Sequence, residues 1–130
     1  QIKRHILCVG QAYYALLNYR REHEINDVAI SRIEQLSPPD YSSIIESLDK
    51  YPNADLMWAQ EEPINNGAWL YLEPRLRMSC NQTQHHKGKC FNVAARPPYA
   101  SVATGHKQAH LAELEQYLSD AFNMERKPLY

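Results

Sequence analysis

Two histidines near the end of the sequence have a spacing that metal ligands often have. His106 and His110 lie four residues apart in a stretch that predicts a helix, so both would project from one helical face. A metal site needs at least a third ligand, and no glutamate or cysteine stands at a suitable offset from this pair. His85 and His86 are adjacent, and neighbouring side chains rarely converge on one ion. We therefore expect no metal-ligating residue.

Carboxylates follow two of the apolar runs. Glu61 and Glu62 come directly after one run, and Glu34 ends another. In a doubly wound sheet, ligands bind at the carboxyl ends of the strands, where paired carboxylates could transfer protons. The alternative is a hydrogen-bonded structural turn, and the Asn65 and Gly67 that follow favour it at least equally. Both interpretations apply to Glu34 as well.

Four basic residues are candidates for binding an anion. Arg96 ends an apolar run and Lys107 opens a predicted helix, so both could meet an anion near the helix N-terminus. Arg20 and Arg21 lie toward the end of the first predicted helix. Arg96, Lys107 or the pair Arg20 and Arg21 could bind an acyl-CoA or nucleotide effector, and a solvated surface position is the alternative for each.

Arg32 is different because it lies inside an apolar run, between Ile30 and Ile33. A buried arginine without a partner is strongly destabilising. We therefore predict that Arg32 forms an ion pair with Glu61 or Glu62 across neighbouring strands, as a structural feature.

The sequence contains no recognisable catalytic set. Its four glycines are isolated, so it has neither of the glycine-rich loops that hold phosphates. Ser31 and Ser37 flank Arg32 and Glu34 without a nucleophile motif. We assign no catalytic residue and no cofactor-binding residue to this chain.

The apolar pattern predicts strands that alternate with helices. The strands are expected at residues 5–9, 28–33, 55–60 and 91–95, and the helices at 11–24, 41–51, 68–78 and 106–122. Asp40 or Ser42 could cap the second helix, and Pro74 implies a kink or a break in the third. The segments 81–89 and 96–105 lack periodicity and are expected to be loops.

This alternation indicates an α/β fold, with a small doubly wound, mostly parallel sheet and helices on both faces. The 130 residues fit one domain, predicted over residues 1–122, with a tail at 123–130. The net charge of −1 gives no basic field for nucleic acid or an anionic membrane, and no apolar run is long enough to span a bilayer. Three cysteines without regular spacing do not indicate a disulfide scaffold, although Cys80 and Cys90 could pair. The first residues lie in a strand pattern without a methionine, as expected of a domain cut from a longer chain.

Several blocks of the sequence resemble one family, in the family's order and spacing from about residue 3 to residue 122. These blocks are Cys8-Val9-Gly10, Arg32-Ile33-Glu34-Gln35-Leu36, Tyr51-Pro52-Asn53-Ala54, Trp58-Ala59-Gln60-Glu61-Glu62-Pro63, Asn65-Asn66-Gly67-Ala68-Trp69, Glu73-Pro74-Arg75-Leu76, Arg96-Pro97-Pro98, Ala103-Thr104-Gly105 and His110-Leu111. The family that they resemble is the first component of 2-oxoglutarate dehydrogenase, and the resemblance is to its C-terminal domain, which has a transketolase C-terminal-like fold. Departures from the family pattern are Pro39-Asp40-Tyr41, Asn66 and Ala95.

The resemblance implies a parent enzyme that decarboxylates 2-oxoglutarate and succinylates a lipoyl carrier in the citric acid cycle. Thiamine diphosphate and magnesium would be bound by preceding domains, so this chain would carry no cofactor and be inactive alone. Its partners would be those domains, a second parent subunit and the lipoyl-bearing succinyltransferase component. The length of the segment 81–89 suggests a eukaryotic, mitochondrial member, in the matrix; a bacterial one would be cytoplasmic. The alternatives are an effector-binding domain, a freestanding interaction module and a 2-oxoadipate-acting paralogue.

Overall fold

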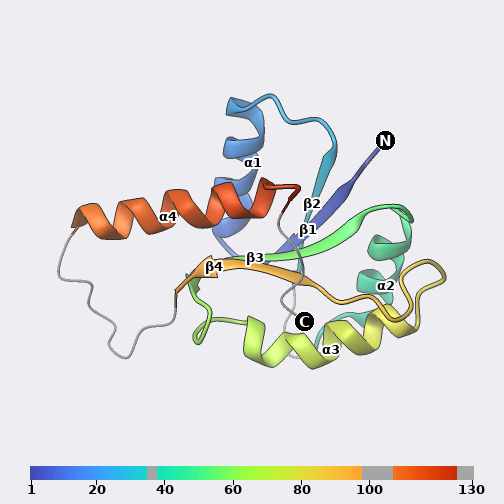
Figure 1. Cartoon of the computed structure of the whole chain (residues 1–130). Helices are drawn as coiled ribbons and strands as arrows, with labels where there is room; N and C mark the ends of the chain where they lie inside the picture. Colours follow the sequence, from blue (N-terminus) through green and yellow to red (C-terminus); the bar gives the residue numbers. More distant parts are fainter. Residues whose placement is uncertain (35–37, 98–106, 126–130) are drawn as a thin grey trace.

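The structure, a computed structural model, describes residues 1–34, 38–97 and 107–125, and within the last helix the side chains from residue 110 onward (Figure 1). Strands and helices alternate strictly along the chain. Their order is β1 (Arg4–Cys8), α1 (Ala12–Glu22), β2 (Val28–Arg32), α2 (Tyr41–Asp49), β3 (Asp55–Pro63), α3 (Trp69–Asn81), β4 (Asn92–Arg96) and α4 (Lys107–Phe122). Within the described residues, no helix is both long enough and apolar enough to cross a membrane.

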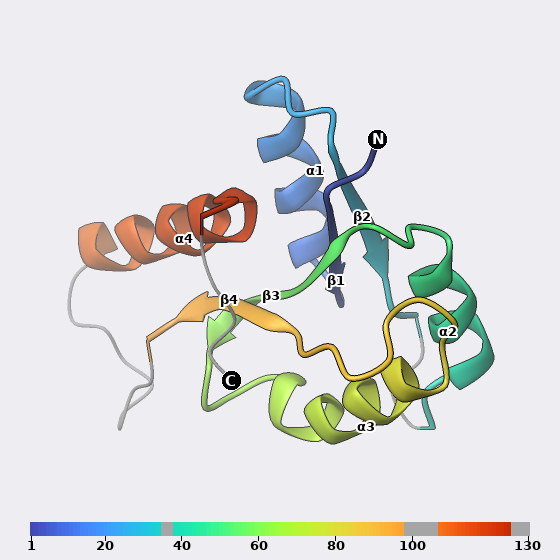
Figure 2. The same ribbon diagram turned by 45° about the vertical axis from the view of Figure 1, so that its right-hand side comes forward.

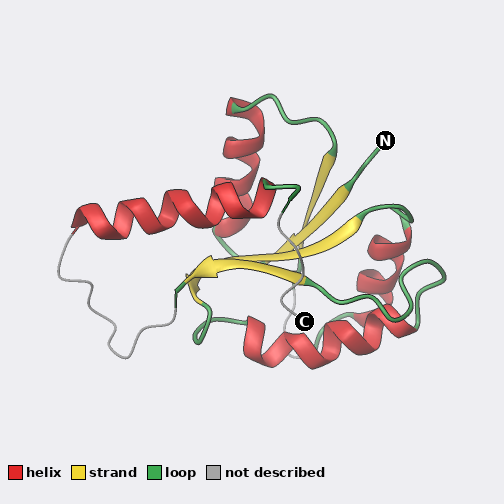
Figure 3. Ribbon diagram, in the orientation of Figure 1, coloured by secondary structure: helices red, strands yellow, loops and turns green. Residues whose placement is uncertain are grey.

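The four strands form one parallel sheet in the order β2-β1-β3-β4. Ile6 of β1 lies opposite Ile30 of β2 and Met57 of β3. Figure 3 shows helices on both sides of this sheet, and Figure 2 shows α2 and α3 on the side opposite α1 and α4. The predicted doubly wound α/β architecture is confirmed.

Alternate residues of each strand build two separate cores, because successive side chains of a strand point to opposite faces. Ile6 and Cys8 join the core under α1 and α4, whereas Leu7 between them joins the core under α2 and α3. The first core also contains Leu16, Met57, Ala94 and Phe122, and the second contains Leu48, Trp58, Trp69, Leu76 and Val93. Burial on both faces explains why the second half of β1, Ile6-Leu7-Cys8, is apolar without interruption.

The observed elements differ from the predicted ones mainly at their ends. The third strand continues to Pro63, three residues beyond its predicted end. Asp40 is the cap of α2, and its carboxylate accepts a hydrogen bond from the Ser43 amide at 3.1 Å. Helix α3 continues through Pro74 without a break. The carbonyl that Pro74 leaves without a helical partner belongs to Leu70 in the first turn, on the exposed side of the helix, where water can reach it.

The sequence analysis missed one buried arginine, Arg4, which ties three elements together. Its guanidinium donates to both carboxylate oxygens of Asp55, at 2.8 and 3.1 Å. It also donates to the carbonyls of Ala121 and Asn123, at 3.1 and 2.7 Å. Four hydrogen bonds thus fix the end of α4 to the starts of β1 and β3, in a charge-assisted arrangement that offsets the burial of the cation.

Candidate functional site

The turn after β3 is organised by the buried amide of Gln60. Its Oε1 accepts hydrogen bonds from Trp58 Nε1 at 2.9 Å and from the Trp69 amide at 3.3 Å. Its Nε2 lies within hydrogen-bonding distance of three backbone carbonyls, those of Glu62 (3.2 Å), Pro63 (2.8 Å) and Asn66 (2.8 Å). One side chain therefore holds the whole connection from β3 to α3.

Gly67 closes this turn in a conformation that favours glycine. Its φ is +75°, and a Cβ here would lie 3.1 Å from Glu62 Oε1 and 3.3 Å from Gln60 Nε2. Asn65 lies in the same turn, before Gly67. The segment after Glu61 and Glu62 is thus a tightly hydrogen-bonded turn, one of the two interpretations that the sequence left open.

A second polar cluster surrounds Arg96 at the end of β4. Arg96 Nε donates to the Glu61 carbonyl at 2.7 Å, and its Nη1 lies 3.1 Å from His110 Nδ1 and 3.6 Å from Glu113 Oε1. Three contacts occupy the guanidinium and connect β3, β4 and α4. Carboxylates outnumber the one arginine, since Glu61 and Glu62 lie at the same end of the sheet. This balance does not favour an anionic ligand.

The groups with displaced pKa values in this region are shifted toward inert forms. Burial, followed by the nearby Glu61 carboxylate, raises the pKa of Tyr117, so its phenol stays protonated. Burial raises the pKa of Cys8 to about 12, so its thiol is not a nucleophile at neutral pH. The chemistry of the cluster is therefore positional: it fixes the ends of the strands against α4.

The predicted pairing of Arg32 with Glu61 or Glu62 is wrong. β1 lies between β2 and β3, so Arg32 and these glutamates are not on neighbouring strands. Arg32 is 31% exposed; its Nε lies 3.9 Å from Glu34 and its Nη1 donates to the Tyr14 hydroxyl at 3.2 Å. The arginine is not buried, and its partners lie just after its own strand and on α1.

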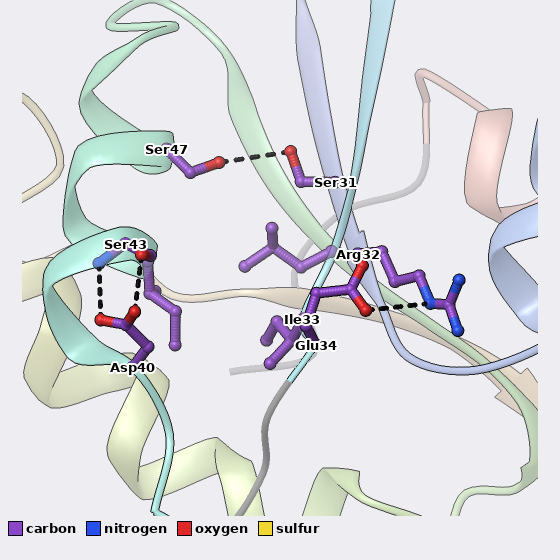
Figure 4. A pocket seen from close by; sticks show the side chains of 9 residues that line it. Ser31, Arg32, Ile33, Glu34, Asp40, Ser43 and Ser47 are labelled. Atoms are coloured by element: carbon purple, nitrogen blue, oxygen red, sulfur yellow. Dashed lines mark hydrogen bonds and ion pairs between the residues drawn. The ribbon is translucent and has the colours of Figure 1, made fainter.

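A cavity of about 250 Å³ lies beside Arg32, between the end of β2 and the start of α2. Figure 4 shows the Arg32–Glu34 pair pointing along one side and the Asp40–Ser43 cap on the other. Ser31 Oγ and Ser47 Oγ are 3.2 Å apart across it. Each of these polar groups already has a protein partner, and no convergent set of groups is aimed at a ligand.

Two of the other basic candidates, Arg20 and Arg21, lie far from Arg96. Arg20 Nη1 donates to the Val28 carbonyl at 3.0 Å, at the opposite end of the sheet, and Arg21 is exposed beside it. Lys107 is the first residue of α4, and its side chain lies outside the described part of the chain. The structure thus does not bring Arg20 and Arg21 together with Arg96, and effector binding by these four residues stays a prediction.

Two histidines are completely buried: His5, which the sequence analysis did not mention, and His86, which it considered only as a metal ligand. His5 Nε2 lies 2.7 Å from Ser31 Oγ, and His86 Nε2 contacts the carbonyls of Leu48 and Tyr51 at 2.9 and 3.1 Å. Burial, with a smaller contribution from His86 and Lys50, lowers the pKa of His5 to about 4. Burial also lowers the pKa of His86. Both side chains are neutral core histidines that join β1, α2 and the segment after α3.

No metal centre is evident in the described residues, which contain no group of three or more His, Cys, Asp or Glu side chains placed to hold an ion. His106 lies outside the described residues, and His110 contacts Arg96. Cys8, Cys80 and Cys90 are all free thiols.

Comparisons with known proteins identify a matching family and several similar sequences. Residues 1–122 match the family described as 2-oxoglutarate dehydrogenase C-terminal. The chain is 45% identical over 124 residues to 2-oxoglutarate dehydrogenase, mitochondrial, of Schizosaccharomyces pombe, covering 93% of the chain and 12% of the relative. It is 42% identical over 123 residues to a probable 2-oxoadipate dehydrogenase complex component E1 homolog of Dictyostelium discoideum (94% and 13%). It is 39% identical over 123 residues to the 2-oxoglutarate dehydrogenase E1 component of Cupriavidus necator (94% and 12%).

Among solved structures, the fold resembles a split gene transketolase described as an inactive beta4 tetramer. The TM-score is 0.59 at 15% identity, over 95% of this chain and 40% of that one. This likeness establishes a shared fold and nothing more. The chain spans 12–13% of the length of the three curated relatives named above.

Proposed function

Because the chain belongs to the 2-oxoglutarate dehydrogenase C-terminal family, we propose that it serves as the structural and assembly domain of a 2-oxoglutarate dehydrogenase first component. The observation that carries this proposal is the state of the polar groups at the carboxyl ends of the strands. In the described residues, Gln60 forms hydrogen bonds with the backbone of the turn after β3, and Arg96 contacts the Glu61 carbonyl and His110 of helix α4. This end of the sheet, where such folds usually bind ligands, is built for rigidity.

The parent enzyme would decarboxylate 2-oxoglutarate and transfer the succinyl group to the lipoyl carrier of its succinyltransferase component. Thiamine diphosphate and magnesium would supply the decarboxylation chemistry from the preceding domains. The relatives named 2-oxoglutarate dehydrogenase support 2-oxoglutarate as the substrate of the parent enzyme. The relative named for 2-oxoadipate dehydrogenase makes 2-oxoadipate the alternative substrate to test. The mitochondrial names of the eukaryotic relatives support a location in the mitochondrial matrix.

Deletion of this domain from the parent enzyme tests the proposal. We expect the deleted enzyme to lose its dimeric assembly in native mass spectrometry and its decarboxylase activity with 2-oxoglutarate, thiamine diphosphate and magnesium. The 130-residue chain alone should show no turnover and no thermal shift with thiamine diphosphate. Turnover by the isolated chain, or an unchanged assembly after deletion, would refute the proposed role. Assaying the intact parent with 2-oxoadipate in parallel decides between the two 2-oxo acids.

A further inference from the structure

Helix α3 is apolar on two opposite sides. Its inner side packs on the sheet through Trp69, Leu72, Leu76 and Cys80, all of them buried. Its outer side carries Leu70, Tyr71, Pro74 and Met78, which we call the outer α3 face. Leu70 is 64% exposed, Met78 50% and Tyr71 39%.

The members of the outer α3 face share one side of the helix. At about 100° of rotation per residue, the four members fall within an arc of roughly 100°, facing away from the buried residues. Figure 2 shows α3 packed below the sheet, with one side turned away from it. A surface helix normally carries polar residues on that side, and a helix apolar on both sides is usually covered on both.

Other exposed apolar side chains of the described residues do not form such a patch. Three of the six large ones belong to α3, and the others are spread over three places. Tyr14 is already engaged by the Arg32 guanidinium, and Leu111 and Met124 stand apart on α4 and after it. A contiguous apolar patch on one element marks an interaction surface, whereas scattered residues do not.

The rim of the face is fixed in position. The Arg75 guanidinium lies 3.8 Å from the centre of the Tyr71 ring and donates to the Tyr71 carbonyl at 2.6 Å. Arg77 pairs with Glu73 at 3.2 Å. A tyrosine held by an arginine beside aliphatic side chains is a composition typical of interface centres. Ordering these side chains before contact lowers the entropic cost of docking.

We infer that the outer α3 face docks against the preceding domains of the same parent chain. This inference rests on the proposed function. The matched region is 12% of the S. pombe relative, so most of the parent lies outside it and is available as the occupant. Four side chains are too few for a stable dimer of this chain, which needs about 800 Å² from each partner. A covalently linked domain needs less contact area, because the linkage raises its effective concentration.

The three methionines of the chain allow a test on the intact parent enzyme. Met57 is buried, whereas Met78 and Met124 are 50% and 40% exposed. Oxidation by dilute hydrogen peroxide, followed by peptide mass spectrometry and scaled to an added methionine peptide, reports the access of each sulfur. In the 130-residue chain, Met78 and Met124 should oxidise at similar rates and Met57 far more slowly. In the parent, Met78 should slow toward the rate of Met57.

An unchanged Met78 rate in the parent overturns the inference. Protection of Met78 that develops in the isolated chain with rising concentration also overturns it, because the occupant is then a second copy. If deletion of the domain abolishes assembly while Met78 stays reactive, the docking surface is wrong and the assembly role stands. If deletion leaves assembly intact, the assembly role itself fails.

A pair of variants provides a second test in the parent. Leu70→Asp combined with Met78→Asp should lower the thermal unfolding midpoint of the parent and leave that of the isolated chain unchanged, since both sites are exposed there. Leu111→Asp, at an exposed leucine on α4, is the matched control and should leave the parent unchanged. Equal midpoints for the double variant and this control contradict docking through α3.

Discussion

Replacing Gln60 by glutamate should destabilise the domain at neutral pH while changing its shape very little. The carboxylate can still accept hydrogen bonds from Trp58 Nε1 and the Trp69 amide. It cannot donate a hydrogen bond, so the carbonyls of Pro63 and Asn66 would lose the donor that Gln60 Nε2 provides at 2.8 Å in the unmodified chain. Each lost donor to a buried group costs about 1–3 kcal/mol, which gives roughly 4 kcal/mol for the two shorter bonds. That is a large part of the stability of an ordinary domain, about 5–15 kcal/mol.

Urea unfolding of the isolated chain, followed by tryptophan fluorescence, measures this loss. Trp58 and Trp69, the only tryptophans, are buried with their rings stacked 6.1 Å apart, next to the altered side chain. Gln11→Glu is the matched control, because it introduces the same charge at an exposed position before α1. Its free energy of unfolding should stay within about 0.5 kcal/mol of that of the unmodified chain. Burial should raise the pKa of the new carboxyl group, and its protonated form can donate one hydrogen bond. The difference between Gln60→Glu and the unmodified chain should therefore shrink as the pH falls from 8 to 5. A difference below about 1 kcal/mol at pH 7 would refute our account of the turn.

Three further predictions concern other described residues. The folded state favours neutral His5, because burial lowers the pKa of this side chain from the usual 6.5 to about 4. Its contribution to stability is therefore complete above pH 6.5 and falls as the pH drops toward 4. Urea unfolding should show a loss of about 2 kcal/mol from His5 between pH 7 and pH 5, and the stability of His5→Phe should depend less on pH. Arg4→Met leaves the carbonyls of Ala121 and Asn123 without their donor, whereas the Asp55 carboxylate is 55% exposed and can be hydrated. The variant should cost roughly 2–4 kcal/mol in the same assay, and a loss below about 1 kcal/mol would mean that α4 is held by its apolar contacts alone. If Arg20, Arg21, Arg96 and Lys107 form an effector site, titration calorimetry with acetyl-CoA, AMP and phosphate should show saturable heat that Arg96→Gln abolishes; absence of heat with all three excludes effector binding by the isolated chain.

The sequence was sufficient to predict every described strand and helix and the layered arrangement. The apolar runs of strands and the 3.6-residue apolar period of helices are local properties of the sequence. It could not supply the order of the strands. The pairing of Arg32 with Glu61 or Glu62 assumed that β2 and β3 are neighbours, but β1 lies between them. Neighbours in sequence need not be neighbours in a sheet, so an ion pair between strands cannot be derived from spacing alone.

The residues that hold the strand ends were partly within reach of sequence reasoning. Gln60 lies two positions after Trp58 in one strand, so both side chains share a face, and that alternation could have predicted a buried amide. Arg4 gave no such signal, because its burial depends on the end of α4, 117 residues away. His86 lies in an irregular polar segment, where no periodicity distinguishes a buried histidine from an exposed one.

The hydrogen bonds from Arg4 to the carbonyls of Ala121 and Asn123 also bear on how the chain folds. They join residues 117 and 119 positions apart, so the first strand and the last helix meet only after almost the whole chain is available. Contacts of such long sequence separation slow folding, because the intervening chain must lose its freedom before they form. During synthesis on the ribosome, β1 emerges early, and the two hydrogen bonds from Arg4 to the carbonyls of Ala121 and Asn123 cannot yet form. The Arg4 guanidinium becomes fully hydrogen-bonded only when the chain has been made through Asn123, so synthesis of the last helix sets the earliest moment at which this domain can be complete.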